Sequence, residues 1–141
     1  MFGSSLEILL VDNDQSNIEN TKNLFKEIKI RNNLNIVENS ASALAYLEHQ
    51  AAYQQARQPA ILMIDRELSQ REDDKLLMSI QANANFNGMI VVMLLRGDAH
   101  ADMSAFQAIR FKHYLKKPLN VQSIVSVLKR TDDLWISIVR G

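Results

Sequence analysis

Short apolar runs recur along the chain, and helix-like segments separate them. The runs cover residues 6–11, 34–37, 60–64, 89–95 and 113–115. Their lengths suit strands, and the segments between them repeat apolar residues at helical spacing. This alternation predicts βα units and a mostly parallel sheet, with right-handed crossovers that place helices on both faces. We therefore expect an α/β fold of the flavodoxin-like, doubly wound (βα)5 type, a three-layer sandwich with strand order 2-1-3-4-5.

Helical periodicity predicts where the helices lie. One begins near Asp14, one begins at Ser40 and runs long towards Pro59, one surrounds Leu76 to Ile80, a short one covers 101–109, and the last extends over about 120–139. Of the 141 residues, 47% are hydrophobic and 23% are charged, which is enough for one full core. We expect residues 1–141 to form a single domain.

Charge and composition argue against several classes of protein. Sixteen basic and sixteen acidic residues give a formal net charge of zero, so nothing indicates a nucleic acid as the main partner. The sequence has no run of about eighteen apolar residues that could span a membrane, and its start lacks a signal-peptide pattern. Without cysteine, disulfides and thiolate metal sites are excluded. A cytoplasmic location is the simplest interpretation.

Acidic residues follow the first and third apolar runs, and basic residues follow the last. Asp65 ends the run at 60–64, Asp12 and Asp14 follow the first run, and Lys117 follows the last. In an open parallel sheet, ligands collect outside the carboxyl ends of the strands, so we expect these side chains to meet there. Acidic and basic groups together suit a cation and phosphate site. An aspartate after a strand is also often only a helix cap or a turn former, and for Asp12 or Asp14 alone that interpretation is equally good.

Three landmarks resemble those of response-regulator receiver domains: Asp12 after the first strand, Asp65 after the third, and Lys117-Pro118 after the fifth. The closing segment 132–139 and the Tyr-, Ala- and Gln-rich segment 52–59 are similar to those of stand-alone receivers that partner bacterial phytochromes. The resemblance covers essentially the whole chain. It implies that Asp65 accepts a phosphoryl group from a sensor histidine kinase, for which a phytochrome-type kinase is the candidate.

The resemblance also implies a role for each residue around the phosphoacceptor. The metal ion would be Mg²⁺, with ligands from Asp12 through water, Asn13, Asp65 and the backbone carbonyl of Glu67. Lys117 would bind the phosphoryl oxygens. Asn13 stands where the family has a carboxylate ligand, so the site loses one negative charge and Mg²⁺ should bind more weakly.

The fourth strand departs from the receiver pattern. Leu95 stands where the family has a hydroxyl residue that bonds the phosphoryl group, and Arg96 stands where a small residue admits the phosphodonor. Arg96 could bind a phosphoryl oxygen, or it could pair with Asp65 and block the site, and we favour the block. Tyr114 matches the aromatic switch position of the family. Because Leu95 fills the space that the ring would enter, we expect Tyr114 to pack rather than to switch.

Three further features follow from the resemblance. Family members have a cis peptide bond before Pro118, which would aim Lys117 at the phosphoacceptor. The loop 68–74 lacks the usual Pro and Gly, so we expect it to take another path and to remain mobile. The end of the last helix carries more apolar surface than the sheet needs, and it is the candidate interface of a homodimer through Trp135, Ile138 and Val139.

Three functions stay open at this point. In the first, the chain is a two-component receiver, not itself an enzyme, which accepts phosphate weakly on Asp65. In the second, it is a pseudo-receiver that acts as a protein-interaction module without phosphate, as Asn13, Leu95 and Arg96 suggest. The more distant third is a hydrolase with an aspartate nucleophile, whose second acid would be Glu67. Such enzymes also use a cap domain and a longer chain.

Overall fold

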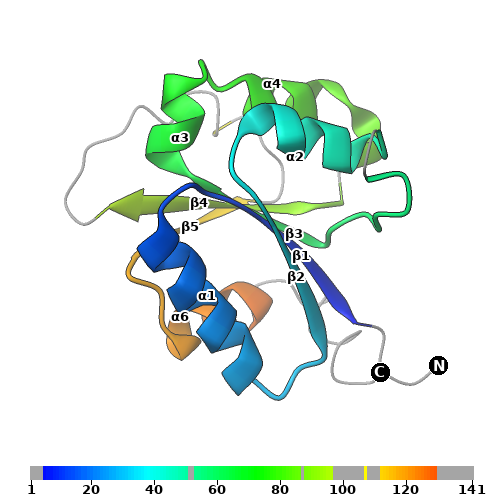
Figure 1. The fold of residues 1–141 in the computed structure, drawn as a ribbon. Helices are drawn as coiled ribbons and strands as arrows, with labels where there is room; N and C mark the ends of the chain where they lie inside the picture. The colour runs from blue at the N-terminus through cyan, green and yellow to red at the C-terminus, as the bar shows by residue number, and fades with distance from the viewer. Residues whose placement is uncertain (1–4, 51–52, 87, 97–106, 108–111, 130–141) are drawn as a thin grey trace.

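Five parallel strands form one sheet in the order β2-β1-β3-β4-β5, which confirms the predicted fold class and strand order (Figure 1). The computed structural model describes residues 5–50, 53–86, 88–96, 107 and 112–129. The strands are β1 (Leu6–Val11), β2 (Asn32–Val37), β3 (Ile61–Asp65), β4 (Ile90–Arg96) and β5 (Lys112–Lys117). The helices are α1 (Gln15–Glu27), α2 (Ser40–Leu47), α3 (Arg66–Arg71), α4 (Lys75–Ala82), the 3₁₀ helix η2 (Ala84–Phe86) and α6 (Val121–Lys129).

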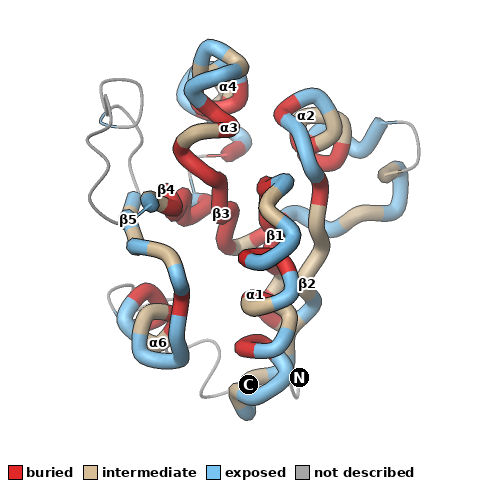
Figure 2. The backbone as a smooth tube through the Cα atoms, turned by 60° about the vertical axis from the view of Figure 1, so that its left-hand side comes forward, coloured by how far each residue is buried: buried red, intermediate tan, exposed pale blue. Residues whose placement is uncertain are grey.

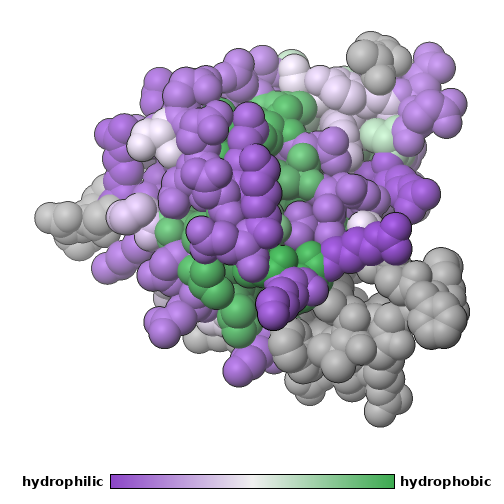
Figure 3. Space-filling view, turned by 60° about the horizontal axis from the view of Figure 1, so that its bottom comes forward, coloured by the Kyte–Doolittle hydropathy of each residue, from purple (hydrophilic) through white to green (hydrophobic). Residues whose placement is uncertain are grey.

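The sheet is the middle of three layers. Helices α2, α3 and α4 cover one face, and α1 and α6 cover the other (Figure 1). Because successive strand residues point to opposite faces, β1 sends Leu9 and Val11 to the first core and Ile8 and Leu10 to the second. The central strands are the most buried part of the chain, as Figure 2 shows. On the side that carries α1 and α6, hydrophilic side chains dominate and apolar residues show between them (Figure 3).

Helix α1 begins close to the predicted position, directly after the acidic end of β1. Asp14 is its N-cap, since Oδ1 accepts hydrogen bonds from the N–H groups of Ser16 (3.1 Å) and Asn17 (3.4 Å). The apolar stripe of the helix, which includes Ile18 and Phe25, is buried. The cap and the stripe together hold the first turn of α1 beside the strand ends.

Helix α2 is much shorter than predicted. His49 adopts a left-handed φ of 57°, and two hydrogen bonds of the Schellman type close the helix. The N–H of His49 donates to the carbonyl of Tyr46 (3.2 Å), and that of Gln50 donates to the carbonyl of Ala45 (2.8 Å). Tyr53 and residues 55–57 then line a groove beside β2, where the sequence predicted continued helix.

The segment after Asp65 is helical, where the sequence predicted a mobile loop. Asp65 is the N-cap of α3, with Oδ2 accepting from the N–H of Leu68 (3.0 Å). The buried guanidinium of Arg66 pairs with Asp74, with 2.5 Å between Nη1 and Oδ1, and the Ser69 hydroxyl donates to the same oxygen (2.7 Å). This buried pair ties the start of α3 to the start of α4.

Two predictions fall wholly or partly outside the described residues. They are the short helix at 101–109 and the end of the last helix, with Trp135, Ile138 and Val139. Helix α6 itself begins at Val121, close to the predicted start, where Oδ1 of Asn120 accepts from the N–H of Ser123 (2.9 Å). Of the helices described above, none is long and apolar enough to cross a membrane.

Candidate functional site

The side chain of Lys117 lies at the centre of an acidic cluster at the carboxyl ends of the strands. Its ammonium nitrogen is 2.8 Å from Oδ1 of Asp65, 2.9 Å from Oδ2 of Asp12 and 3.5 Å from Oδ2 of Asp14. The side chains of Lys117, Asp12 and Asp65 are 8%, 0% and 7% exposed. The structure therefore joins the basic end of β5 to the acidic ends of β3 and β1, which lie two and three positions along the sheet from β5.

Three donors hold the buried carboxylate of Asp12. Oδ1 accepts from the N–H of Asp14 (3.0 Å), and Oδ2 accepts from the Asn17 amide (2.7 Å) and from Lys117. A carboxylate removed from water needs such partners to offset its lost hydration. Asn17 was not predicted as a site residue. Its only signal in the sequence is that it is polar and directly precedes the apolar stripe of α1. Asp12 is thus held in place by the start of α1 and by the lysine of β5.

The neighbouring charges shift two pKa values. Burial lowers the pKa of Lys117, but its hydrogen bonds to Asp65 and Asp12 and their charges raise it more, so the pKa lies above the usual 10.5. Burial raises the pKa of Asp14, but the N–H of Asn17 and the charge of Lys117 lower it more, to below the usual 3.8. At neutral pH the cluster therefore keeps the Lys117 cation and the Asp14 anion.

The donor chemistry of the cluster fits a hard divalent cation. Three carboxylates and one ammonium sum to a formal charge of minus two, and carboxylate oxygens are ligands that Mg²⁺ takes. In the described part of the chain, no three His, Cys, Asp or Glu side chains already surround a common metal position. The carboxylate oxygens point to Lys117 instead. A metal ion would therefore share Asp12 and Asp65 with the lysine.

Two of the predicted metal ligands lie apart from the carboxylates around Lys117. Asn13 is exposed, and the side chain of Glu67 pairs with arginines. Asp14 brings its carboxylate to the cluster in place of Asn13, one residue further along the chain. The backbone carbonyl of Glu67, which the resemblance assigns to the metal, belongs to the first turn of α3.

Arg96 belongs to an exposed ion-pair group at the mouth of the site. Its Nη1 lies 3.7 Å from Oε1 of Glu67, and Nη2 of Arg71 lies 3.6 Å from Oε2 of the same carboxylate. The three side chains are between 45% and 66% exposed. The favoured pairing of Arg96 with Asp65 is therefore wrong, because Asp65 is buried with Lys117 and the arginine reaches outward to the exposed carboxylate.

The remaining predicted residues surround this centre. Leu95 is partly buried against the core below α2 and α4. Tyr114 was expected to pack, but it is 66% exposed. The peptide bond between Lys117 and Pro118 is cis. A cavity of about 430 Å³ lies beside the cluster, between α1 and the strand ends that carry Arg96 and Lys117.

A parallel sheet of order 2-1-3-4-5, with two buried aspartates and a buried lysine at its carboxyl rim, is the arrangement that the resemblance to response-regulator receiver domains implies. No family model matches the chain. The sequence is 23% identical over 132 residues to response regulator Rcp1 of Synechocystis sp., which covers 94% of this chain and 90% of that protein. The chain is thus similar to Rcp1 over nearly the whole length of both.

Two solved structures share the fold. The phosphorylated cyanobacterial phytochrome response regulator RcpA has a TM-score of 0.74 at 19% identity, and the match covers 95% of this chain and 96% of RcpA. The Mn²⁺-bound form of response regulator Rcp1 has a TM-score of 0.70 at 22% identity, with 92% and 93% covered. The chain therefore shares the fold of these two response regulators and is similar in sequence to Rcp1.

Proposed function

We propose that this protein is a two-component receiver that accepts a phosphoryl group on Asp65 from a sensor histidine kinase. The observation that carries the proposal is the 2.8 Å contact between the Asp65 carboxylate and the buried Lys117 ammonium at the end of β3. Such a pair offers a nucleophile and a fixed positive charge for the transferred group. The similarity to Rcp1 and to phosphorylated RcpA supports the same function, with a phytochrome-type kinase as the candidate donor.

The carboxylate of Asp65 is the nucleophile of the transfer. A carboxylate oxygen of Asp65 forms the new O–P bond while the P–N bond of the phosphohistidine breaks, and the electron pair of that bond stays on the imidazole nitrogen. After the transfer, the Lys117 ammonium contacts the negatively charged phosphoryl oxygens. Its contact with Asp12 keeps the ammonium at the rim while Asp65 is modified.

A divalent cation would bind on the same rim. We assign Asp12, Asp65 and the backbone carbonyl of Glu67 as its ligands, with Asn13 as the weak position and Asp14 as the compensating carboxylate. When bound, Mg²⁺ would neutralise the transferring oxygens. The buried position of Asp12 and its three donors hold one of these carboxylates in a fixed orientation.

Arg96 is the second group that we assign to the phosphoryl oxygens. Leu95 has no hydroxyl to donate, and Arg96 is the next residue of β4. Its ion pair with Glu67 is long and exposed, so little free energy is lost when the guanidinium leaves Glu67 for a phosphoryl group. A guanidinium can donate two hydrogen bonds to such a group.

Incubation with Mg²⁺ and acetyl phosphate, followed by intact-mass measurement, tests the proposal. The wild-type protein should gain one phosphoryl group, and Asp65→Asn should gain none. Asp73→Asn is the matched control, because Asp73 is an exposed aspartate of the next turn and should leave the gain unchanged. Absence of the gain in the wild-type protein would remove phosphotransfer and leave the pseudo-receiver.

The pseudo-receiver is the second candidate, and the altered β4 end favours it. In that case Lys117 serves only to neutralise the buried carboxylates, and the fold acts as an interaction module. The proposed homodimer through Trp135, Ile138 and Val139 lies outside the described residues and stays a prediction. The cytoplasmic location and the absence of enzymatic activity also remain predictions.

A further inference from the structure

The two edges of the sheet differ in how they are protected from another strand. The edge strand β5 carries an exposed lysine at its start, Lys112, and another near its end, Lys116. The other edge strand, β2, reads Asn-Asn-Leu-Asn-Ile-Val, with neither a charged residue nor a proline. Charged side chains and proline are the usual means by which an edge strand avoids pairing. The edge of β2 has none of them.

Backbone groups of β2 point away from the sheet at alternate residues. The carbonyls of Arg31 and Val37 accept from β1, so the odd-numbered residues of this segment face β1. The N–H and C=O groups of Asn32, Leu34 and Ile36 then point to the outside. Among the strands described here, only β1 pairs with β2. With a rise of about 3.3 Å per residue, β2 offers an edge of roughly 20 Å.

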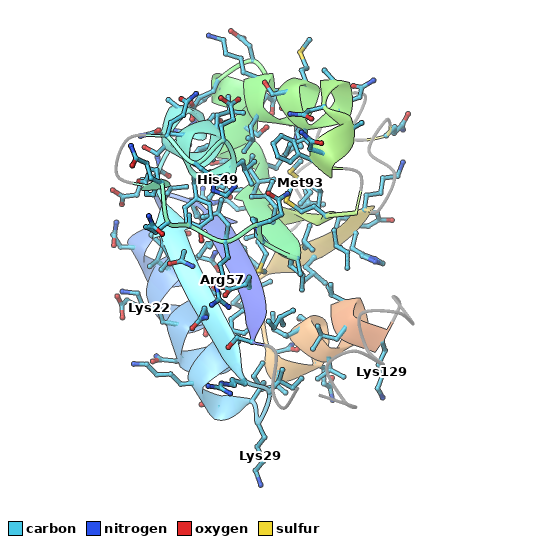
Figure 4. All side chains as sticks on the ribbon, turned by 90° about the vertical axis from the view of Figure 1, so that its right-hand side faces the viewer. Lys22, Lys29, His49, Arg57, Met93 and Lys129 are labelled. Carbon is cyan, nitrogen blue, oxygen red and sulfur yellow. The ribbon has the colours of Figure 1, made fainter. Side chains whose placement is uncertain are left out.

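A groove of about 570 Å³ runs along this edge. The whole of β2 lines it, together with Glu7 of β1, Tyr46 of α2, and Tyr53 and residues 55–57, which follow the early end of α2. Figure 4 looks towards this edge and places Arg57 beside the strands, below α2. Because residues 53–57 form a wall on one side, the groove suits a single extended segment better than the edge of a second folded copy.

The side chains of the groove indicate what the segment should carry. Arg57 is 78% exposed, whereas its partner Glu7 is only 13% exposed, and 3.9 Å separates them. The Asn33 amide also donates to Glu7 (3.0 Å), so the accessible charge is the guanidinium. The rings of Tyr46 and Tyr53 lie 5.4 Å apart and offer an apolar contact. An acidic side chain next to an apolar one matches this arrangement.

We propose that the β2 edge is a docking site for an extended, acidic segment of a partner protein, which adds to the sheet as a sixth strand. Backbone hydrogen bonds to Asn32, Leu34 and Ile36 would supply affinity, and Arg57 with Tyr53 would supply selectivity. The site is separate from the acidic cluster, since the groove contains none of the residues that contact Lys117. The proposal therefore rests on residues other than those of the proposed phosphotransfer.

The test uses two labelled peptides in which valine and threonine alternate. One peptide has a glutamate at its centre, and the matched peptide has a lysine there. The glutamate peptide should bind at least tenfold more tightly by fluorescence anisotropy, and Arg57→Glu should reverse the order. Arg57 is exposed, so this variant should fold. Hydrogen exchange should slow at Asn32, Leu34 and Ile36 and stay unchanged in β5.

Four outcomes decide the matter. Selective binding with protection of β2 supports the site, and the same result in Asp65→Asn separates it from the proposed phosphotransfer. Equal binding of both peptides, or binding that leaves the β2 amides unchanged, overturns it. Failure of both peptides to bind at millimolar concentration also overturns it. Self-association of the free protein with protection of the same amides would assign the edge to a second copy and contradict the proposal.

Discussion

Two groups of ion pairs lie near Asp65, the candidate phosphoacceptor, and they differ in how deeply they are buried. Around Lys117, the side chains of the lysine and of Asp12 and Asp65 are at most 8% exposed. Around Glu67, the side chains of the glutamate and both arginines are at least 45% exposed. Buried charges are held by each other because water cannot replace a lost partner, whereas exposed charges can exchange partners at little cost. The first group should set the geometry of the site and the second should adapt to what enters it.

The largest effect should come from loss of the buried lysine. Lys117→Met leaves Asp12 and Asp65 close together without their cation, so the free energy of unfolding should fall by roughly 3–5 kcal/mol. Urea denaturation in the presence of EDTA measures this change. Lys116→Met is the matched control, since Lys116 is the exposed neighbour and should shift the value by no more than about 0.5 kcal/mol. Equal losses in Lys117→Met and Lys116→Met would contradict the claimed difference between buried and exposed charges.

A somewhat smaller loss should follow when the second buried pair is broken. Asp74→Asn keeps the shape of the side chain and its tolerance of a left-handed φ, but it leaves the Arg66 guanidinium, 5% exposed, without a counter-ion. Because Asp74 itself is 20% exposed, we expect a loss of about 2 kcal/mol. Thermal and urea unfolding should agree on it. Asp73→Asn changes the exposed neighbour and should have little effect, and a loss equal to that of Asp74→Asn would show that the turn, not the ion pair, matters.

The stabilisation that Lys117 contributes to the buried group should be present at neutral pH and should decrease at alkaline pH. The pKa of Lys117 is raised above 10.5 in the folded protein, so the stabilisation is complete below 10.5 and is lost as pH rises through the folded-state pKa. The difference in unfolding free energy between wild type and Lys117→Met, measured in EDTA, should therefore shrink above pH 10.5. A difference that stays constant or grows there would contradict the charge-based account.

The exposed group should give the smallest effect. Glu67→Gln removes the shared partner of Arg71 and Arg96 but leaves all three side chains in contact with water. We expect the free energy of unfolding to differ from that of the wild type by at most about 0.5 kcal/mol. This difference should not become larger in 0.5 M salt, because salt largely screens exposed ion pairs. A loss comparable with that of Lys117→Met would mean that burial does not separate the two groups.

Features that short, continuous segments of the sequence determine were predicted correctly. The strand order follows from the alternation of apolar runs and helical patterns, and the meeting of Asp12, Asp65 and Lys117 follows from where those runs end. Asp12 and Asp65 directly follow a run and Lys117 comes two residues after one, so no long-range information was required. The helix at 15–27 was predicted for the same reason, from its cap and its apolar stripe.

Features set by contacts between distant or atypical residues were not predicted. The early end of α2 depends on a left-handed His49, a conformation that the sequence signals only when glycine or asparagine is present. Helix α3 depends on the pairing of Arg66 with Asp74 across the following turn. Arg96 was expected to pair with Asp65, but Lys117 already pairs with that carboxylate, and the arginine pairs with the exposed Glu67 instead.

The central claim is that the carboxylate held by Lys117 is the phosphoacceptor, and mapping the modified residue tests it most directly. After incubation with acetyl phosphate and Mg²⁺, borohydride reduces an aspartyl phosphate to homoserine, and tandem mass spectrometry of the digested protein locates that residue. The account predicts homoserine at position 65 in the wild-type protein and none in Asp65→Asn. Unmodified Asp65, or homoserine at another aspartate, would contradict it.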